Sequence, residues 1–427
     1  VLQLISTQLI SYPSICLSFG AMRGTHLLQW TCYFSILSAA LSFLAPVTFN
    51  DLNLAWLLPR ISRNKLSCNE LSMTDQQFKT EPDVELYSHL KVAVLGGGAF
   101  SLALSKVLSY KNISSSLLVR QQDVADHINE HHYHPKYLSD SVLPLQVIAT
   151  ADPATALHGA DYAIHAVPMQ QSRGFLTSIK PFLPHTVPVL SVTKGVEQGT
   201  FSLMNDIIVE TLGENQRAAY LSGPSFAKEI MNGEATAVVI ASEEEGLAKE
   251  LAEMLSSTEF RCHTSRDVKG VELGGAVKNV IALAAGMCEG LDLGMNAMSS
   301  LVTRGCMEMT RMGMLFGADA ETFGGLAGVG DTFGTCLGPL SRNRQVGYRL
   351  AKGESLEDIL ATLDGVSEGV NTVLALEQLL KTKVRPNVFQ FKFPIIAGVA
   401  QIIKGNISPS FGLNLLMRYP VRDENRG

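Results

Sequence analysis

Short apolar segments rich in β-branched residues recur along the chain from Lys91, and helical segments lie between most of them. Strands that are separated by helices form parallel sheets, and both faces of such a sheet are covered. This pattern predicts an α/β Rossmann-type N-terminal domain with a parallel-rich sheet. Its expected strands are Lys91–Leu95, Ser115–Val119, Tyr162–Val167, Val187–Val192, Ala218–Leu221 and Ala235–Ala241.

After Val268 the strand pattern stops and the remaining segments have helical periodicity. The sequence therefore predicts an all-α C-terminal domain, whose expected helices are Gly275–Gly290, Ala297–Phe316, Ser341–Leu350, Ser355–Leu363, Gly369–Leu380 and Pro394–Ile403. The expected organisation has a leader and linker at 1–80, the Rossmann-type domain at 81–267, the helical domain at 268–420 and a tail at 421–427.

The first eighty residues differ from the rest of the chain. The stretch from Leu27 to Val47 is almost uncharged and follows the basic pair Met22-Arg23. A basic start before an apolar segment is typical of a signal-type leader, which we expect at Met22–Lys65 and expect to be removed. The alternative is a retained membrane anchor, because the apolar run is long enough to cross a bilayer, although Pro46 weakens it. We expect no permanent membrane span in the mature protein.

The charge balance limits the classes of partner. With 34 basic and 40 acidic side chains the net charge is −6, so binding of nucleic acid through a broad basic face is not expected. An anionic substrate must instead meet a few placed cations. The seven cysteines form no CxxC pair, and Cys262-His263 has no zinc-ligand spacing. We expect no metal site and free thiols in a reducing compartment.

A glycine-rich turn follows the first strand. Leu95 leads directly into Gly96-Gly97-Gly98-Ala99-Phe100-Ser101, and a helix is expected from Leu102. Gly96 makes the tight turn, Gly98 lets the backbone approach a pyrophosphate, and the helix presents free N–H groups to it. Ser101 stands where the dinucleotide fingerprint has its third glycine. The prediction is an NAD or NADP site, and the alternative is a tight turn without a ligand.

Arg120 follows the second strand, where NAD-selective sites carry an acid that binds the ribose hydroxyls. An arginine there suits a 2′-phosphate, which favours NADP or the use of both cofactors. The alternative is a solvated arginine with no role in binding.

Further motifs stand at expected strand ends and in the helical half. The strand-end motifs are Val167-Pro168-Met169-Gln170, Thr193-Lys194-Gly195 and Leu221-Ser222-Gly223-Pro224-Ser225-Phe226-Ala227. The helical half contains Gly275-Ala276-Val277-Lys278-Asn279-Val280, Gly328-Val329-Gly330-Asp331, Ser341-Arg342-Asn343-Arg344 and Val366-Ser367-Glu368-Gly369. In this order the motifs resemble the bacterial-type and plastid-type glycerol-3-phosphate dehydrogenases, over nearly the whole stretch from Lys91 to Met417. The Gly-Ala-Val-Lys-Asn and Ser-Arg-Asn motifs are the most specific.

This resemblance implies reversible NAD(P)H-dependent reduction of dihydroxyacetone phosphate to sn-glycerol 3-phosphate, feeding glycerolipid synthesis. It implies that Lys278 is the general acid/base, that Lys194 polarises and orients the substrate, and that Asp331 binds a substrate hydroxyl and holds both lysines. The implied substrate contacts also include Gly223, Ser225, Ser341, Arg342 and Asn343, with Arg342 as the main charge for the phosphate. The expected cofactor contacts are Gly96, Gly98, Ala99, Phe100, Arg120, Pro168, Lys194, Ala227, Arg342, Val366 and Glu368.

The surroundings of Lys278 support its assignment independently. Its helix neighbours three and four positions away are Gly274, Gly275, Ile281 and Ala282, so no carboxylate can pair with it within the helix. Desolvation among small apolar residues disfavours the charged form of a lysine and suits it to proton transfer. The alternative is a lysine whose stem lies along an amphipathic helix with its ammonium in water.

Two departures from the family pattern, Ser101 and Thr332-Phe333-Gly334, bear on cofactor affinity rather than on the reaction. A related 3-hydroxyacid-type dehydrogenase is an alternative reading, but it need not carry Ser341-Arg342-Asn343. A non-catalytic NAD(P)-sensing protein is another, but it would be expected to lose Lys194 or Lys278. The run from Ile128 to His132 is the remaining candidate for a metal site, and it has no further ligand at a suitable spacing.

Two segments indicate a cellular location. The stretch Leu117–Thr150 is most similar to the plastid branch of the family, and Ser42–Pro46 resembles the cleavage region of bipartite plastid leaders. We therefore expect a plastid protein that is delivered by a cleaved leader, with a cytoplasmic protein as the alternative. A homodimer is among the assemblies that the resemblance allows.

Overall fold

The computed structural model describes residues 84–418, which belong to one compact unit. The predicted leader Met22–Lys65, the tail 421–427 and the cysteines at 16, 32 and 68 lie outside the described residues. The four cysteines of the described stretch, Cys262, Cys288, Cys306 and Cys336, carry free thiols.

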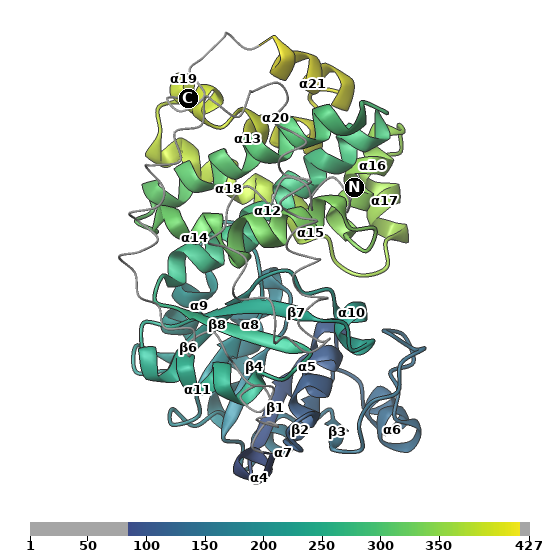
Figure 1. Ribbon diagram of the computed structural model, residues 1–427, viewed down its shortest axis with the longest axis vertical. Helices are drawn as coiled ribbons and strands as arrows, with labels where there is room; N and C mark the ends of the chain where they lie inside the picture. The colour runs from purple at the N-terminus through teal and green to yellow at the C-terminus, as the bar shows by residue number, and fades with distance from the viewer. Residues whose placement is uncertain (1–83, 419–427) are drawn as a thin grey trace, which may run out of the picture. The chain divides into compact units, whose positions relative to one another are not determined.

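The described residues form one sheet of eight strands in the order β3-β2-β1-β4-β5-β6-β7-β8 (Figure 1). Neighbouring strands are parallel except for β6 and β7, which are antiparallel. The prediction of a parallel-rich Rossmann-type sheet is confirmed. The strands are β1 Lys91–Leu95, β2 Ser114–Leu118, β3 Val147–Thr150, β4 Tyr162–His165, β5 Val189–Ser191, β6 Ala218–Ser222, β7 Thr236–Ala241 and β8 Phe260–Ser265.

The six predicted strands are all present, with ends that differ by at most a few residues, but β3 and β8 were not predicted. Both lie at the edges of the sheet. An edge strand needs no continuous apolar sequence, because part of its side chains face water. In β3, Val147 is buried while Ile148 is exposed, and in β8 the polar Arg261 and His263 are exposed.

Alternate residues of β1 belong to separate apolar clusters on the two faces of the sheet, because strand side chains alternate in direction. Val92 and Val94 pack in a cluster that includes residues of α5 and α11, whereas Ala93 and Leu95 pack with residues of α8 and α9. The helices of this half are α4 Val84–Tyr87, α5 Ala99–Ser109, α6 Gln122–His131, α7 Pro153–Leu157, α8 Met169–Ile179, η2 Lys180–Phe182, α9 Met204–Leu212, α10 Ala227–Met231 and α11 Glu245–Leu255.

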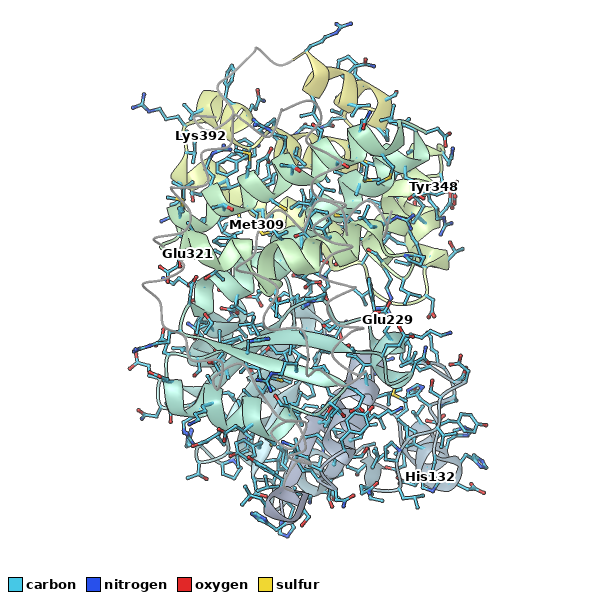
Figure 2. All side chains as sticks on the ribbon, viewed as in Figure 1. His132, Glu229, Met309, Glu321, Tyr348 and Lys392 are labelled. Atoms are coloured by element: carbon cyan, nitrogen blue, oxygen red, sulfur yellow. The ribbon has the colours of Figure 1, made fainter. Side chains whose placement is uncertain are left out.

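From residue 268 the described chain is helical, which confirms the predicted all-α C-terminal part. Its helices are α12 Val268–Gly290, α13 Gly294–Leu315, α14 Ala320–Gly324, the π-helix η3 Leu326–Gly330, α15 Asp331–Leu337, α16 Arg342–Ala351, α17 Leu356–Thr362, α18 Glu368–Lys383, α19 Pro386–Lys392, α20 Pro394–Ile403 and α21 Pro409–Met417. In Figure 2, Met309 on α13 lies among these helices, whereas Tyr348 on α16 lies at their edge.

Helix α12 is the core of the helical half. It is long and apolar enough to cross a membrane by length and composition alone, but 94% of its most apolar window is buried within the protein. It begins at Val268 rather than at the predicted Gly275, because the side chain of Asp267 accepts a hydrogen bond from the Gly270 N–H and caps the helix. A Cβ on Gly286 would lie 1.9 Å from the Arg344 carbonyl oxygen, so this glycine allows α12 and α16 to touch backbone to backbone.

Candidate active site

Two lysines from distant parts of the chain meet on one carboxylate. Lys194 follows β5, Lys278 lies in the middle of α12, and Asp331 is the first residue of α15. The Nζ of Lys194 donates to Asp331 Oδ2 at 2.6 Å, and the Nζ of Lys278 donates to Asp331 Oδ1 at 2.7 Å. The structure therefore brings together the three residues that the sequence indicated as catalytic.

Two adjacent glycines of α12 make this meeting sterically feasible. A Cβ on Gly275 would lie 2.7 Å from Ser222 Oγ and 3.3 Å from Lys194 Cγ, so the Lys194 stem passes close over the helix. A Cβ on Gly274 would lie 2.5 Å from the Ala327 carbonyl oxygen in η3, the helix that leads into Asp331. The pair thus allows both Lys194 and Asp331 to approach α12.

Burial shapes the electrostatics of this cluster. Burial lowers the pKa of Lys194 to about 8, although the Asp331 carboxylate acts in the opposite direction, and the neighbouring Lys278 adds to the lowering. Burial alone would raise the pKa of Asp331, but the two ammonium groups outweigh it and hold that pKa below its ordinary value. Asp331 is therefore an anion that balances one of two cations, and the cluster carries net positive charge until Lys194 loses its proton.

Lys278 has no carboxylate partner within its own helix, and its partner is Asp331, the residue that the resemblance to the family indicated as holding both lysines. Its carboxylate comes from α15, 53 residues along the chain. Thr335 was missed: its Oγ1 accepts from Lys278 Nζ at 2.8 Å and lies 3.2 Å from Asp331 Oδ1. The signal that could have indicated Thr335 is its position four residues after Asp331, which places both on one helix face.

Gly223 and Ser225 lie beside Lys194. Gly223 follows β6 with φ of +143°, and a Cβ there would lie 2.9 Å from the Val238 backbone, so only glycine suits the position. Its carbonyl oxygen accepts from Lys194 Nζ at 3.2 Å and from Ser225 Oγ at 3.0 Å. The Ser225 hydroxyl proton is therefore already committed to the protein.

The predicted phosphate-binding motif opens helix α16. Ser341 is its N-cap, and its Oγ accepts from the Arg344 N–H at 3.2 Å. Arg342 has no ion pair within residues 84–418, and its guanidinium lies against the backbone of Gly365, where a Cβ would fall 2.6 Å from Arg342 Cζ. Asn343 is buried, and its side chain bonds to other helices of the protein.

The glycine-rich turn between β1 and α5 is closely packed at Gly96 and Gly97 and open at Gly98. Gly96 has φ of +118°, and a Cβ on Gly97 would lie 2.9 Å from Val119 Cγ1. Gly98 is the N-cap of α5 and has no atom within 4 Å of its Cβ position, so its outer side is open to a ligand. Ala99 and Phe100 begin α5. Ser101 is fully buried, which fits the close-packed third position of the fingerprint.

The remaining predicted cofactor contacts come from both halves. Pro168 precedes α8, and the Met169 N–H donates to Glu368 Oε1 at 3.2 Å. Burial raises the pKa of Glu368 to about 7, and its Oε2 has no hydrogen-bond partner in the described part of the chain. Ala227 begins α10, Val366 is 45% exposed, and the exposed Arg120 follows β2. Within residues 84–418, Arg120 forms no hydrogen bond or ion pair with Lys194, Lys278 or Asp331.

The histidine run at the end of α6 forms ring contacts, with the rings of His127 and His131 4.6 Å apart and those of His127 and Tyr133 4.7 Å apart. Within residues 84–418 there is no group of three or more His, Cys, Asp or Glu side chains that could hold a metal ion.

Comparison with known proteins adds to this geometry. Residues 91–248 match the family model of the NAD-dependent glycerol-3-phosphate dehydrogenase N-terminus, and residues 267–414 match that of its C-terminus. A chloroplastic glycerol-3-phosphate dehydrogenase [NAD(+)] of Arabidopsis thaliana is 42% identical over 78% of this chain and 79% of its own length. The glycerol-3-phosphate dehydrogenase [NAD(P)+] of Oleidesulfovibrio alaskensis is 41% identical over 78% of this chain and all of its own length.

Among solved structures, glycerol-3-phosphate dehydrogenase from Coxiella burnetii superposes with a TM-score of 0.73 at 31% identity. The superposition covers 78% of this chain and all of that protein. The similarity therefore spans both the sheet half and the helical half.

Proposed function

Because this chain belongs to the NAD-dependent glycerol-3-phosphate dehydrogenase family, we propose that Lys278, Lys194 and Asp331 carry out its reaction. That reaction is the NAD(P)-dependent interconversion of dihydroxyacetone phosphate and sn-glycerol 3-phosphate. The observation that carries the assignment of residues is the meeting of two lysines on one buried carboxylate. We propose that residues 81–267 bind the cofactor, and that residues 268–420 contain the general acid and the residues that bind the substrate phosphate.

The free donors of the two lysines indicate how they act. An ammonium has three N–H groups. Lys278 directs two of them to Asp331 and Thr335, and Lys194 directs two to Asp331 and Gly223, so each keeps one for a substrate. Lys278 would donate its proton to the carbonyl oxygen during reduction, and Lys194 would hold the substrate in position. Asp331 keeps both ammonium groups in place and would accept from a substrate hydroxyl.

The phosphate is assigned to the start of α16. Arg342 has no competing carboxylate in residues 84–418, and the first N–H groups of a helix have no partner within it. A dianion there would be met by the guanidinium, by the main-chain N–H groups of Arg342 and Asn343, and by the positive end of the helix dipole. Ser341 holds that first turn in shape.

The residues at the glycine-rich turn fit a dinucleotide. The open side of Gly98 and the uncapped start of α5 would bind the pyrophosphate. The rest of the dinucleotide would contact Pro168, Ala227, Val366 and Glu368. A nicotinamide, when bound, supplies the hydride chemistry of the reaction. Arg120 has no ion pair within the described residues and suits a 2′-phosphate, so we propose use of NADPH as well as NADH.

The location and assembly are further parts of the proposal. We propose that the segment Met22–Lys65 directs the chain to a plastid, where it is removed and the enzyme supplies sn-glycerol 3-phosphate for glycerolipids. The chloroplastic relatives of Arabidopsis thaliana and Oryza sativa support this location. A fluorescent fusion of the full chain that stayed in the cytosol would contradict it. A homodimer is the proposed assembly, and sedimentation of the purified protein tests it.

The experiment that tests the function follows NADH and NADPH absorbance with dihydroxyacetone phosphate, using the wild type and Asp331→Asn. Wild-type protein is expected to oxidise both cofactors. Asp331→Asn removes the anion that holds both lysines, so turnover should fall at least about 100-fold while NAD(P)H binding persists. Turnover that survived this change would contradict the assignment of the cluster.

A further inference from the structure

Two asparagines that each follow a proposed functional residue are hydrogen-bonded to each other. Asn279 follows Lys278 in α12, and Asn343 follows Arg342 in α16. The Nδ2 of Asn343 donates to Asn279 Oδ1 at 2.8 Å, and the two residues are 8% and 5% exposed. This buried hydrogen bond therefore joins α12, which carries the proposed general acid Lys278, to α16, which carries the proposed phosphate-binding residue Arg342.

Main-chain groups on either side of the Asn343–Asn279 pair determine which side-chain atom is the donor and which is the acceptor. The Gly369 N–H donates to Asn343 Oδ1 at 3.0 Å, so this atom must be the amide oxygen. At the other end Asn279 Nδ2 donates to the Gly275 carbonyl oxygen at 3.3 Å. The chain therefore runs in one direction, from Gly369 through Asn343 and Asn279 to Gly275.

Asn343 also caps a third helix from outside. Ser367 is the N-cap residue of α18 but makes no capping bond, and its hydroxyl donates to Asn343 Oδ1 at 2.7 Å. The capping hydrogen bond is made by Asn343 instead, because its Oδ1 accepts from the Gly369 N–H in the first turn of α18. A Cβ on Gly369 would lie 2.8 Å from both the Asn279 carbonyl oxygen and Asn343 Oδ1, so a glycine is needed for this approach.

We propose that Asn279 and Asn343 form a tie that fixes α12, α16 and α18 relative to one another. The inference rests on the proposed roles of Lys278, Arg342 and Glu368, because each of these is the immediate neighbour of a residue in the tie. Asn343 is then a positioning residue in addition to its proposed contact with the substrate. Its Oδ1 accepts two hydrogen bonds and one of its two Nδ2 N–H groups donates to Asn279, so the other Nδ2 N–H and the main-chain N–H remain for the phosphate.

The tie links chemistry to binding. If it is broken, the acid on α12 and the phosphate grip on α16 can shift relative to each other, and a misplacement of about 1 Å can cost about 100-fold in rate. A loss through misplacement should appear in both kcat and KM. A residue that only touched the phosphate would act mainly on KM.

A double-mutant cycle tests the tie. Asn279→Ala and Asn343→Ala are each expected to lower kcat/KM for dihydroxyacetone phosphate by about 10- to 100-fold, with kcat and KM both affected. The double variant should lose no more than about threefold beyond the worse single variant, because one break already releases the tie. Losses that multiply would show independent roles and overturn the proposal, as would either single variant with wild-type kinetics.

Three further variants separate the outcomes. Asn129→Ala is the matched control, because this asparagine joins α6 to Ala149 of β3 through two hydrogen bonds, at 2.9 and 2.7 Å, and should leave kcat/KM for the substrate unchanged. Ser367→Ala removes one of the two donors to Asn343 Oδ1, so a loss of about two- to tenfold is expected. If Asn279→Ala and Asn343→Ala both fail to fold, the kinetics of Ser367→Ala test the tie in their place. Wild-type kinetics in Ser367→Ala would then overturn the proposal. An unchanged KM in Arg342→Ala would reject only the assignment of Arg342 to the phosphate. The proposed tie would stand, because the double-mutant cycle measures the coupling between Asn279 and Asn343 independently of Arg342.

Discussion

The sheet half, residues 84–267, and the helical half, residues 268–418, place functional groups by different means. In the sheet half the candidate groups stand at strand ends and are largely main-chain atoms, as at Gly96, Gly98 and Gly223. In the helical half they are side chains, and other helices hold them: Asp331 holds Lys278, and Asn343 joins Asn279. The comparison teaches that one half depends on local backbone shape, whereas the other depends on contacts between distant segments.

The largest effect is expected in the helical half, from Lys278→Met. The variant removes the proposed acid and leaves Asp331 paired with Lys194, so the fold and NAD(P)H binding should persist while kcat falls about 10²–10⁴-fold. Lys278→Arg should fail almost as badly, because a guanidinium does not release its proton near neutral pH. Steady-state kcat and NAD(P)H fluorescence titration measure the two properties. If either variant kept turnover within about tenfold of wild type, proton transfer would be reassigned, first to Lys194.

The next effect separates binding from chemistry. Arg342→Ala should raise the KM for dihydroxyacetone phosphate by about 30- to 1000-fold, because a charge-assisted grip on phosphate contributes about 2–4 kcal/mol. Arg344→Ala is the control, since Arg344 lies on the same helix but pairs with Glu289 at 2.5 Å. An unchanged KM in Arg342→Ala, or an equal rise in both variants, would remove the phosphate assignment.

A smaller effect is expected in the sheet half, from Gly98→Ala. The added Cβ meets nothing in the protein, so stability should be unchanged, but it occupies space that the proposed pyrophosphate needs. The dissociation constant of NAD(P)H should rise about tenfold or more while kcat at saturating cofactor stays near wild type. Gly174→Ala in α8 has equally open surroundings and should change neither. Unaltered NAD(P)H affinity in Gly98→Ala would place the cofactor elsewhere.

The same contrast explains how much could be predicted from the sequence. Local sequence patterns determine the strands, the glycine-rich turn and the position of Lys194. For the central strands of the sheet half, the predicted bounds therefore agree with the structure to within a few residues. The edge strands β3 and β8 were missed because half-exposed strands carry weak apolar patterns. In the helical half the helices could be predicted, but short ones such as α14 and α15 could not, because a few residues show no clear period.

The partners of the site residues were harder to predict than the residues themselves. The neighbours of Lys278 in its own helix indicated no carboxylate partner, and only the resemblance to the family named Asp331, which lies on another helix. Asn343 was expected to contact the substrate, and the sequence did not indicate that its side chain also joins two other helices. No spacing in the sequence indicates which distant side chain completes a hydrogen bond. The resemblance to a family suggested the members of the site and left their geometry open.

A pH profile sharpens the comparison at Lys194, where the two halves meet. Burial lowers the pKa of this ammonium to about 8, so its charge is present below that pH and is lost as pH rises through it. The phosphate of the substrate stays a dianion over the same range. We therefore expect kcat/KM to fall by about tenfold for each pH unit above 8. Lys194→Arg, whose charge persists, should lose this alkaline decline while having lower activity overall. A wild-type profile that stayed flat to pH 9.5 would contradict this role.

The smallest effect on catalysis is expected where α12 contacts the sheet half through Glu272. Its Oε1 accepts from the Asn205 N–H at 3.1 Å, and its buried Oε2 has no partner within residues 84–418. Burial raises the pKa of Glu272 to about 8 from an ordinary value of 4.5. Because the unfolded chain ionises this group more readily, the stability that the protonated form contributes is lost as pH rises from about 4.5 to 8. Glu272→Gln keeps the acceptor and cannot ionise, so urea unfolding at pH 8.5 should show the variant about 1–3 kcal/mol more stable, with little difference at pH 4.5 and unchanged kcat. A variant that was equally destabilised at both pH values would show that the carboxylate itself stabilises this contact between the two halves.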